Sequence, residues 1–270
     1  MKDLHLGKHS EYPDQYDAGL LIPIPRKLGR EALKLSGELP FVGADLWTGY
    51  ELSWLDAQGK PQVAIAEFTV PANSEALIES KSFKLYLNSY NQTAFERWSD
   101  VSQRLEDDLS QCAGGPVLVQ LYTLANYQKQ GIQELPGECI DTLDVAIDCY
   151  HPDPALLDVT DGGEVSETLH SHLLKTNCPV TGQPDWASVM VRYRGRQISR
   201  EGLLKYIVSF RQHQDFHEQC VERMFNDILN RCGPEELDVY ARYTRRGGLD
   251  INPWRSTSTA MPGSFRLVRQ

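Results

Sequence analysis

One stretch of this chain occurs twice and decides the fold. The first copy spans residues 84–123 and reads KLYLNSYNQTAFERWSDVSQRLEDDLSQCAGGPVLVQLYT. The second spans residues 205–244 and reads KYIVSFRQHQDFHEQCVERMFNDILNRCGPEELDVYARYT. With a one-residue gap, the aligned pairs are Lys84 with Lys205, Phe95 with Phe216, and Cys112 with Cys232. Each aligned pair alone is weak evidence of a duplication. The shared order of helix, Cys-Gly boundary and strand predicts two related modules.

The second copy lies in a segment with a clear pattern of secondary structure. Apolar residues alternate with polar ones in ETLHSHLLKT (167–176) and WASVMVRYRG (186–195), which predicts two strands. Two amphipathic helices follow, and Gly233-Pro234 ends the second. Alternation over 237–243 predicts a third strand, and GSFRLVRQ (263–270) is the predicted fourth. The order is β-β-α-α-β-β.

The first copy repeats this order. The predicted strands are DLWTGYELSWL (45–55), QVAIAEFTVP (62–71) and PVLVQLYTL (116–124), and the helices are ESKSFKLYLNSY (79–90) and the segment that carries Phe95 to Leu109. We therefore expect an α+β protein with tandem modules, each a four-stranded antiparallel sheet with two helices. Unpaired edge strands should pair between modules or between chains.

Domain boundaries follow from composition. The segment HPDPALLDVTDGGEV is rich in Pro, Gly and Asp, which is typical of a linker. We place the first module at 1–150, the linker at 151–165 and the second module at 166–270.

Charge and hydropathy exclude several classes of function. The chain has 270 residues, of which 41% are apolar, and a formal net charge of −10 with a pI near 5.2. So acidic a protein is not expected to bind nucleic acid directly. It contains no run of about 18 apolar residues, and its N-terminal stretch lacks the apolar segment of a secretory signal. We expect a cytoplasmic protein that does not contact membranes.

The six cysteines show neither CxxC pairs nor the dense spacing of a disulfide framework. We expect reduced thiols. His and Cys are scattered without short ligand pairs, so we expect no metal site.

Cys178 and Asp185 lie seven residues apart in CPVTGQPDW, in a turn-rich loop before a strand. A thiolate is a nucleophile, and a nearby carboxylate can exchange a proton with it or with a substrate anion. An ionised carboxylate would raise the pKa of the thiol by repulsion. The alternative is that Asp185 orders a turn and Cys178 fills a gap.

Other chemistry-bearing residues also have structural explanations. His217 and Glu218 fall in the first turn of a helix, where Glu is favoured by the helix dipole and His can be a core residue. Arg246 and Gly247 belong to a basic, Gly-containing stretch that suits phosphate, or that balances the acidic surface. Neither GxGxxG after a strand nor GxxxxGK[ST] is present, so no Rossmann or P-loop site is visible.

Four strings in the same order resemble the nitrile reductases that make 7-aminomethyl-7-deazaguanine for queuosine in tRNA. They are ESKSFKLY (79–86), CPVTGQPDW (178–186), FHE (216–218) and RYTRRGGLDINPWRS (242–256). The resemblance covers nearly the whole chain and corresponds to the long form of that family. It implies the tunnelling fold, shared with GTP cyclohydrolase I, and a homodimer.

The resemblance also implies roles for individual residues. Cys178 would be the nucleophile and Asp185 the proton donor. The residues expected to hold the deazapurine are Ile78, Glu79, Ser80, His217 and Glu218. Those expected to contact NADPH are Ser80, Lys81, Arg246 and Gly247.

The implied reaction is a four-electron reduction of the nitrile of 7-cyano-7-deazaguanine through a covalent thioimide on Cys178. It would consume two NADPH per turnover and need no metal. The alternatives are a tunnelling-fold cyclohydrolase with Cys and His as zinc ligands, another purine- or pterin-binding enzyme, a nitrile hydrolase, or a binding module without chemistry.

Overall fold

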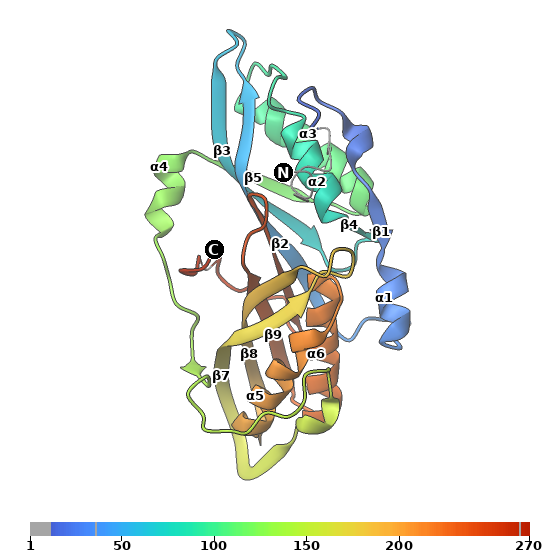
Figure 1. The fold of residues 1–270 in the computed structure, drawn as a ribbon, viewed down its shortest axis with the longest axis vertical. Helices are drawn as coiled ribbons and strands as arrows, with labels where there is room; N and C mark the ends of the chain where they lie inside the picture. The colour runs from blue at the N-terminus through green and yellow to red at the C-terminus, as the bar shows by residue number, and fades with distance from the viewer. Residues whose placement is uncertain (1–11, 36, 265) are drawn as a thin grey trace, which may run out of the picture.

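In the computed structural model, residues 12–35, 37–264 and 266–270 are described, and these form one long eight-stranded sheet with helices packed on it (Figure 1). The sheet strands are β2 (Val42–Leu55), β3 (Pro61–Pro71), β5 (Leu118–Tyr122), β6 (Glu138–Cys139), β7 (Val159–Asn177), β8 (Pro184–Ile198), β9 (Glu236–Tyr243) and β10 (Leu249–Ser256). Their spatial order is β5-β3-β2-β10-β9-β8-β7-β6. β1 (Pro23–Pro25) and β4 (Ala76–Ile78) form a separate antiparallel pair.

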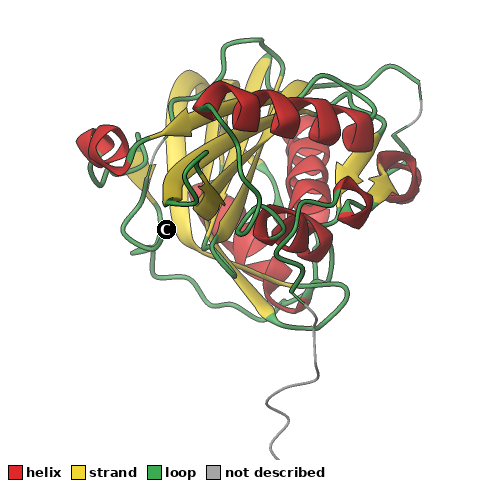
Figure 2. Ribbon diagram, turned by 90° about the horizontal axis from the view of Figure 1, so that it is seen from above, coloured by secondary structure: helices red, strands yellow, loops and turns green. Residues whose placement is uncertain are grey.

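The helices connect strands within each half of the chain. They are α1 (Arg26–Ala32), α2 (Ser80–Asn88), α3 (Trp98–Ala113), α4 (Leu124–Tyr127), α5 (Arg200–Ser209) and α6 (His217–Cys232). Single 3-10 turns lie at Ala18–Leu20, Gln128–Gln130, Pro154–Leu156 and Phe210–Gln212. The view from above separates the sheet from the helices beside it (Figure 2).

The two modules are joined through the middle of the sheet. β2 of the first module pairs antiparallel with β10 of the second, from Val42 opposite Ser256 to Gly49 opposite Leu249. This pairing removes one edge from each module, as expected from the cost of unpaired backbone groups. The predicted tandem α+β organisation is confirmed.

The duplication is visible in matching contacts. Tyr86 donates a hydrogen bond of 2.7 Å to Asp108 on α3, and Tyr206 donates one of 2.6 Å to Asp227 on α6. Both long helices end at a left-handed glycine. Tyr86 therefore corresponds to Tyr206 in the structure. The alignment that matches Lys84 with Lys205 instead places Tyr86 opposite the residue after Tyr206. Lys84 and Lys205 are only partly buried, so the fact that both are lysine says little about how the two helices pack.

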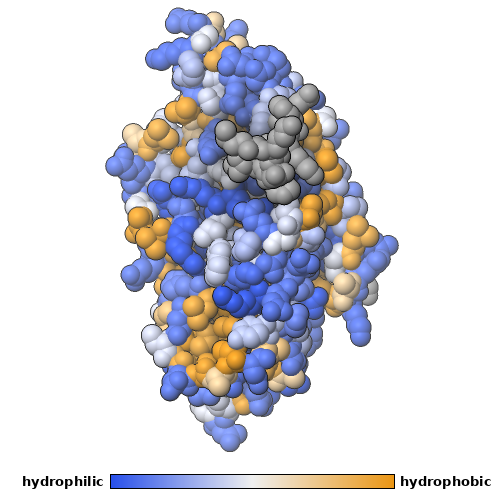
Figure 3. Space-filling view, in the orientation of Figure 1, coloured by the Kyte–Doolittle hydropathy of each residue, from blue (hydrophilic) through white to orange (hydrophobic). Residues whose placement is uncertain are grey.

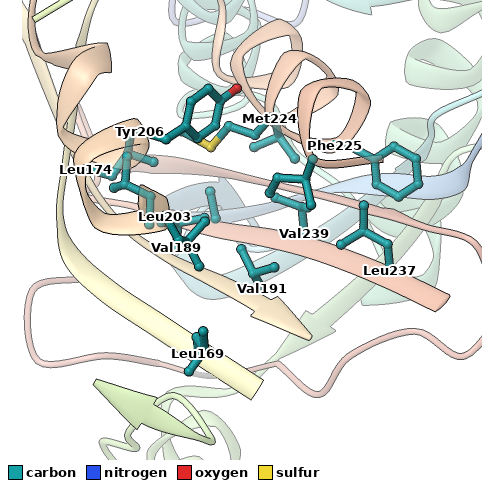
Figure 4. Close-up of a cluster of buried hydrophobic side chains, with 14 of the residues drawn as sticks. Leu169, Leu174, Val189, Val191, Leu203, Tyr206, Met224, Phe225, Leu237 and Val239 are labelled. Atoms are coloured by element: carbon teal, nitrogen blue, oxygen red, sulfur yellow. The ribbon is translucent and has the colours of Figure 1, made fainter. Parts of the chain in front are cut away.

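Each half has its own apolar core. In the second half, side chains of α5 and α6 cover the sheet, and Figure 4 shows Tyr206 of α5 and Met224 of α6 next to each other above the valines of β8 and β9. The labelled core residues are Leu169, Leu174, Val189, Val191, Leu203, Tyr206, Met224, Phe225, Leu237 and Val239. Burying one such side chain contributes roughly 1.5–3 kcal/mol. The first half is packed around Trp47, Phe68 and Phe83.

Three details differ from the expectations. The described residues of 263–270 form no strand, and the last strand is β10 at Leu249–Ser256. Of the strands within 1–150, β2, β3 and β5 lie together in the large sheet, whereas the two-residue β6 lies at its opposite edge and pairs in parallel with β7 of the second module. Residues 159–165, which we placed in the linker, begin β7, where a register shift between Val159 and Glu164 accommodates the Gly pair. The domain bounds themselves remain a prediction.

The surface seen in Figure 3 is mainly hydrophilic, with apolar side chains in separate patches. Within the described ranges, no helix is long and apolar enough to cross a membrane.

Candidate active site

A cavity of about 420 Å³ lies between the two modules, and residues of both halves line it. Of the residues singled out from the sequence, those that line it are Ile78, Glu79, Ser80, Lys81, Cys178, Asp185, His217, Glu218 and Arg246. One chain therefore brings together the motif at the start of α2 and the predicted nucleophile. The volume falls within the usual range for small-molecule sites.

Cys178 lies directly after β7, in the hairpin loop that leads to β8. Its backbone N–H donates to the Gln183 carbonyl (2.9 Å), and the Gly182 N–H donates to the Cys178 carbonyl (2.9 Å). Gly182 has φ +69°, a backbone conformation that residues with a side chain rarely adopt, so this tight loop favours glycine there. The loop therefore holds Cys178 at the cavity wall.

The environment of the thiol favours its ionised form. Burial alone would raise the pKa of Cys178, but hydrogen bonds from the Thr181 side chain, from the N–H groups of Val180 and Thr181, and from Arg246 outweigh it. The net result is a pKa below the usual value for cysteine. A thiolate is the reactive form of cysteine, so the loop prepares Cys178 for nucleophilic attack.

Asp185 is buried, with 3% of its surface exposed, and is held by two basic side chains. Arg246 Nη1 lies 2.6 Å from Asp185 Oδ1, and His217 Nε2 lies 3.4 Å from Oδ2. Burial would raise the pKa of Asp185, but the hydrogen bonds and charges of His217 and Arg246 lower it on balance. The carboxylate is thus ionised, and Arg246 offsets its repulsion of the Cys178 thiolate.

His217 begins α6, as the sequence predicts. Its ring stacks on Tyr243, with centroids 3.7 Å apart and planes 6° from parallel. Within the part of the chain that the structure describes, its Nδ1 is buried without a hydrogen-bond partner. The stacked ring is therefore fixed with Nε2 toward Asp185 and Nδ1 available to a ligand.

Glu218, the next residue of α6, is 3% exposed and lines the same cavity. Burial, followed by the negative charge of Asp45, raises the pKa of Glu218 to about 8. At neutral pH this carboxyl group is largely protonated. A carboxylic acid can donate one hydrogen bond and accept others, which suits a heterocycle with mixed donors and acceptors.

Beneath Glu218 lies a buried ionic cluster that connects the modules. Arg255 of β10 contacts Asp45 of β2 and Glu222 of α6, both at 2.9 Å. Arg30 of α1 contacts Glu222 at 2.7 Å, and Arg26 contacts Asp45 at 2.6 Å. Because Glu222 is one helical turn after Glu218, this cluster fixes the start of α6 relative to the first module.

The motif at the start of α2 forms the opposite wall. Glu79 is the N-cap of the helix, and its carboxylate accepts hydrogen bonds from the N–H groups of Lys81 (2.9 Å) and Ser82 (2.6 Å). Ile78 is the last residue of β4 and is buried. The motif therefore has a structural role in capping, beside the binding role that its position at the cavity permits.

Gly247 stands apart from the other predicted residues. It lines a smaller cavity of about 50 Å³ together with Lys84. Its φ is +58°, and a Cβ there would lie 3.3 Å from Lys84 Cδ. The turn between β9 and β10 thus lies against the lysine rather than in the main cavity.

The comparisons with known proteins agree with these motifs. Residues 12–121 match the family described as nitrile reductase, 7-cyano-7-deazaguanine-reductase N-term, and residues 184–261 match the QueF-like protein family. A protein of Bordetella pertussis named NADPH-dependent 7-cyano-7-deazaguanine reductase is 58% identical over 98% of this chain and 97% of its own length. The chain belongs to the 7-cyano-7-deazaguanine reductase family. A protein of the same name from Bordetella bronchiseptica matches equally well.

Among solved structures, the apo crystal structure of the archaeosine synthase QueF-Like is 19% identical, with a TM-score of 0.31, and covers 38% of this chain and 100% of that one. The family resemblance drawn from the four sequence strings is confirmed by the curated reductases.

Sequence reasoning missed several residues of this reductase-family site. Trp47, Lys84 and Ile251 line the cavity. Lys84 follows Ser80 by four residues, so helical spacing alone places both on one face of α2. Burial and the charge of Arg246 lower the pKa of Lys84. A cavity of about 790 Å³ elsewhere is larger, but none of the predicted site residues lines it.

Proposed function

We propose that this chain reduces the nitrile of 7-cyano-7-deazaguanine to the aminomethyl group with NADPH, in the biosynthesis of queuosine. The observation that carries the proposal is the convergence of Cys178, Asp185 and Arg246 in one interdomain cavity. The names of the relatives support the same reaction.

The deazapurine would bind between the two modules. Trp47 and Ile78 offer apolar contact to a planar ring, while Glu218 and Glu79 offer polar groups to its guanine-like edge. Glu79 already accepts two backbone hydrogen bonds, and a carboxylate has further lone pairs for a ligand. His217 Nδ1 supplies another polar contact.

The first chemical step would join Cys178 to the substrate. The sulfur attacks the nitrile carbon, one C–N π bond breaks, and the nitrogen takes up a proton, giving a thioimide without net oxidation or reduction. Asp185 is ionised in the free site, so it must first accept a proton, either from the Cys178 thiol or through His217, before it passes one to nitrogen.

Two reductions then complete the reaction. The thioimide carbon would take up one hydride while its nitrogen takes up a proton. After the sulfur has left, the imine carbon would take up a second hydride and its nitrogen a second proton, and two NADPH molecules bound in turn would supply the hydrides. Arg246 and the loop N–H groups stabilise the departing Cys178 thiolate. The interdomain cavity must exclude water meanwhile, because hydrolysis would divert the thioimide or the imine.

The basic residues beside the cavity fit a dinucleotide phosphate in their chemistry. Lys81 is exposed in the first turn of α2, and Lys84 lies deeper, next to the Gly247 turn. Ser80 lines the same cavity as the two lysines and adds a hydroxyl group. Arg246 is less available than the sequence implied, because its guanidinium is engaged by Asp185.

Two measurements test the proposal. The nicotinamide absorbance of NADPH should fall when the nitrile is added, by two NADPH per nitrile consumed. Without NADPH, the protein should gain the mass of the nitrile at Cys178, and Cys178→Ala should lose both signals. Cys149→Ala, which removes a thiol outside the site, should lose neither. An adduct on another cysteine, or turnover that needs no NADPH, would refute the mechanism.

We also propose that two chains form a homodimer. Among the described residues, β5 is an edge strand of the large sheet, and its Leu118 is 62% exposed. An open edge with an exposed apolar side chain favours pairing with a second copy. Sedimentation analysis should give twice the chain mass, and a species of single-chain mass at micromolar concentration would refute the dimer.

A further inference from the structure

We propose that Cys139, His170 and His172 form a binding site for a divalent transition metal, with zinc as the ion best suited to them. One ligand atom of each residue lies within 4.8 Å of the others. A tetrahedral zinc needs ligand atoms about 3.3–3.6 Å apart, given Zn–N near 2.0 Å and Zn–S near 2.3 Å. Ligand atoms at the 4.8 Å limit would therefore have to approach one another by about 1.2–1.5 Å.

Strand geometry places the three residues together. His170 and His172 are two residues apart on β7, where alternate side chains share a face. Cys139 is directly opposite His170 in the parallel pairing of β6 with β7, and the Ile140 N–H donates to the His170 carbonyl at 3.0 Å. The ligands thus come from two paired strands at one edge of the sheet.

The hydrogen bonds of the two imidazoles prepare them for a metal. His170 Nδ1 lies 3.1 Å from the Pro136 carbonyl oxygen, which can only accept, so Nδ1 carries the proton and a neutral ring has its lone pair on Nε2. His172 Nδ1 lies 2.7 Å from Ser188 Oγ, which can accept as well as donate, so when Nδ1 donates to Ser188 the lone pair of His172 Nε2 is also available to a ligand. Such contacts fix the tautomer in most histidine metal sites.

The sulfur completes a donor set that selects the class of metal. One thiolate and two imidazoles suit zinc, and they disfavour magnesium and calcium, which prefer oxygen ligands. Cys139 would lose its proton on binding. His170 is buried and His172 exposed, so an ion can enter from solvent.

Three protein ligands leave a fourth position open. All three line the cavity of about 790 Å³, which is separate from the site that contains Cys178. Two arginines, Arg242 and Arg269, and one carboxylate, Glu134, line it too, so polar groups of both charges surround the space in which water or a small ligand could take the fourth position.

The metal would also hold an otherwise weak element. β6 has two residues and joins the sheet at its edge, after the chain descends from α4 along the side of the sheet (Figure 1). A metal bridge between Cys139 and the two histidines would cross-link β6 to β7.

Cobalt provides a direct test on the purified full-length protein after treatment with a chelator. Co²⁺ should bind one equivalent per chain and show a thiolate-to-cobalt absorption band, and Zn²⁺ should displace it. Cys139→Ser should remove the band. His172→Gln changes an exposed position where folding is not at risk, and it should lower the affinity for zinc at least about 10- to 100-fold. Ser188→Ala should lower that affinity about tenfold.

Matched variants make the assignment specific. Cys149→Ser removes a thiol from the same connecting segment, and Cys178→Ala removes the thiol of the other cavity, so both should keep the band. Zinc should also raise the melting temperature of the wild type but not that of His172→Gln. Failure to bind Co²⁺ or Zn²⁺ in stoichiometric amount, a band that survives Cys139→Ser, or a band lost in Cys178→Ala would each overturn the proposal.

Discussion

Arg246 Nη1 lies 2.6 Å from Asp185 Oδ1, and the same guanidinium donates a hydrogen bond to Cys178. One arginine thus stabilises the negative charge of both residues that we propose as catalytic. The family resemblance assigns Arg246 to NADPH, and the geometry gives it a second task. The two tasks predict different effects of removing it.

Arg246→Ala should raise the pKa of Cys178 and slow formation of the nitrile adduct even when NADPH is absent. The thiolate is the reactive form, so the pH profile of alkylation of Cys178 should move to higher pH. Arg245→Ala, at an exposed neighbour that contacts Tyr50, is the matched control and should leave the profile in place. Cys112, whose pKa burial raises to about 11, should react only at higher pH in every variant.

A role in phosphate binding predicts something else for the same variant. The loss of a charge-assisted contact costs about 1.5–3 kcal/mol, or at least about a tenfold rise in KM for NADPH. An unchanged alkylation profile together with a raised KM for NADPH would mean that Arg246 acts on the cofactor alone.

Asp185→Asn should slow adduct formation by about two to four powers of ten, because the amide cannot exchange the proton that the nitrile nitrogen needs. Asp238→Asn is the control, since Asp238 is also buried and also pairs with an arginine, Arg192, at 2.6 Å, but it does not line the cavity that contains Cys178. Rates of adduct formation by stopped-flow and melting temperatures separate chemistry from folding. A wild-type rate for Asp185→Asn would leave His217 as the next candidate for the acid.

Glu218→Gln should remove a pH dependence of stability. The pKa of Glu218 is raised to about 8 in the folded chain, against an ordinary value of 4.5. The folded state therefore holds a proton that the unfolded state releases, and the stability from this group is lost as pH rises from about 4.5 through about 8. The melting temperature of wild type should fall across this window more steeply than that of Glu218→Gln. Parallel curves would show that Glu218 is ionised throughout.

Glu222→Gln should destabilise the fold by about 3–5 kcal/mol, because it leaves the buried Arg255 and Arg30 without their shared carboxylate. Glu235→Gln removes an exposed partner of Arg194 and should change stability little. Urea unfolding of the two variants gives the comparison. Equal midpoints would contradict a structural role for the buried cluster.

Local patterns predicted most of the elements. Alternation located β2, β3, β7, β8 and β9, because apolar side chains on one face of each strand belong to a core that helices cover. Three- and four-residue spacing located α3 and α6 for the same reason. The sequence pattern did not predict β10. Its polar residues Asp250, Asn252 and Arg255 are fully buried, so polar residues do not mark an exposed face of this strand.

Site chemistry was less accessible from the residues alone. From spacing alone, a catalytic pair was one of two explanations for Cys178 and Asp185. The roles of the other site residues came from the family strings. The two-residue separation of His170 and His172 was a readable strand signal, but their approach to Cys139 depends on the pairing of β6 with β7. Sequence offers no measure of such a contact between segments 30 residues apart.

By itself, the sequence determined the duplication, most of the helices and strands of each copy, and the family, because these depend on local periodicity and on strings of neighbouring residues. Only the tertiary structure decided that β2 pairs with β10, that Arg246 contacts Asp185, and that both modules line one cavity. These features depend on which buried charges find partners once the modules meet. Such contacts join residues that are far apart in the sequence, so the order of residues along the chain does not predict them.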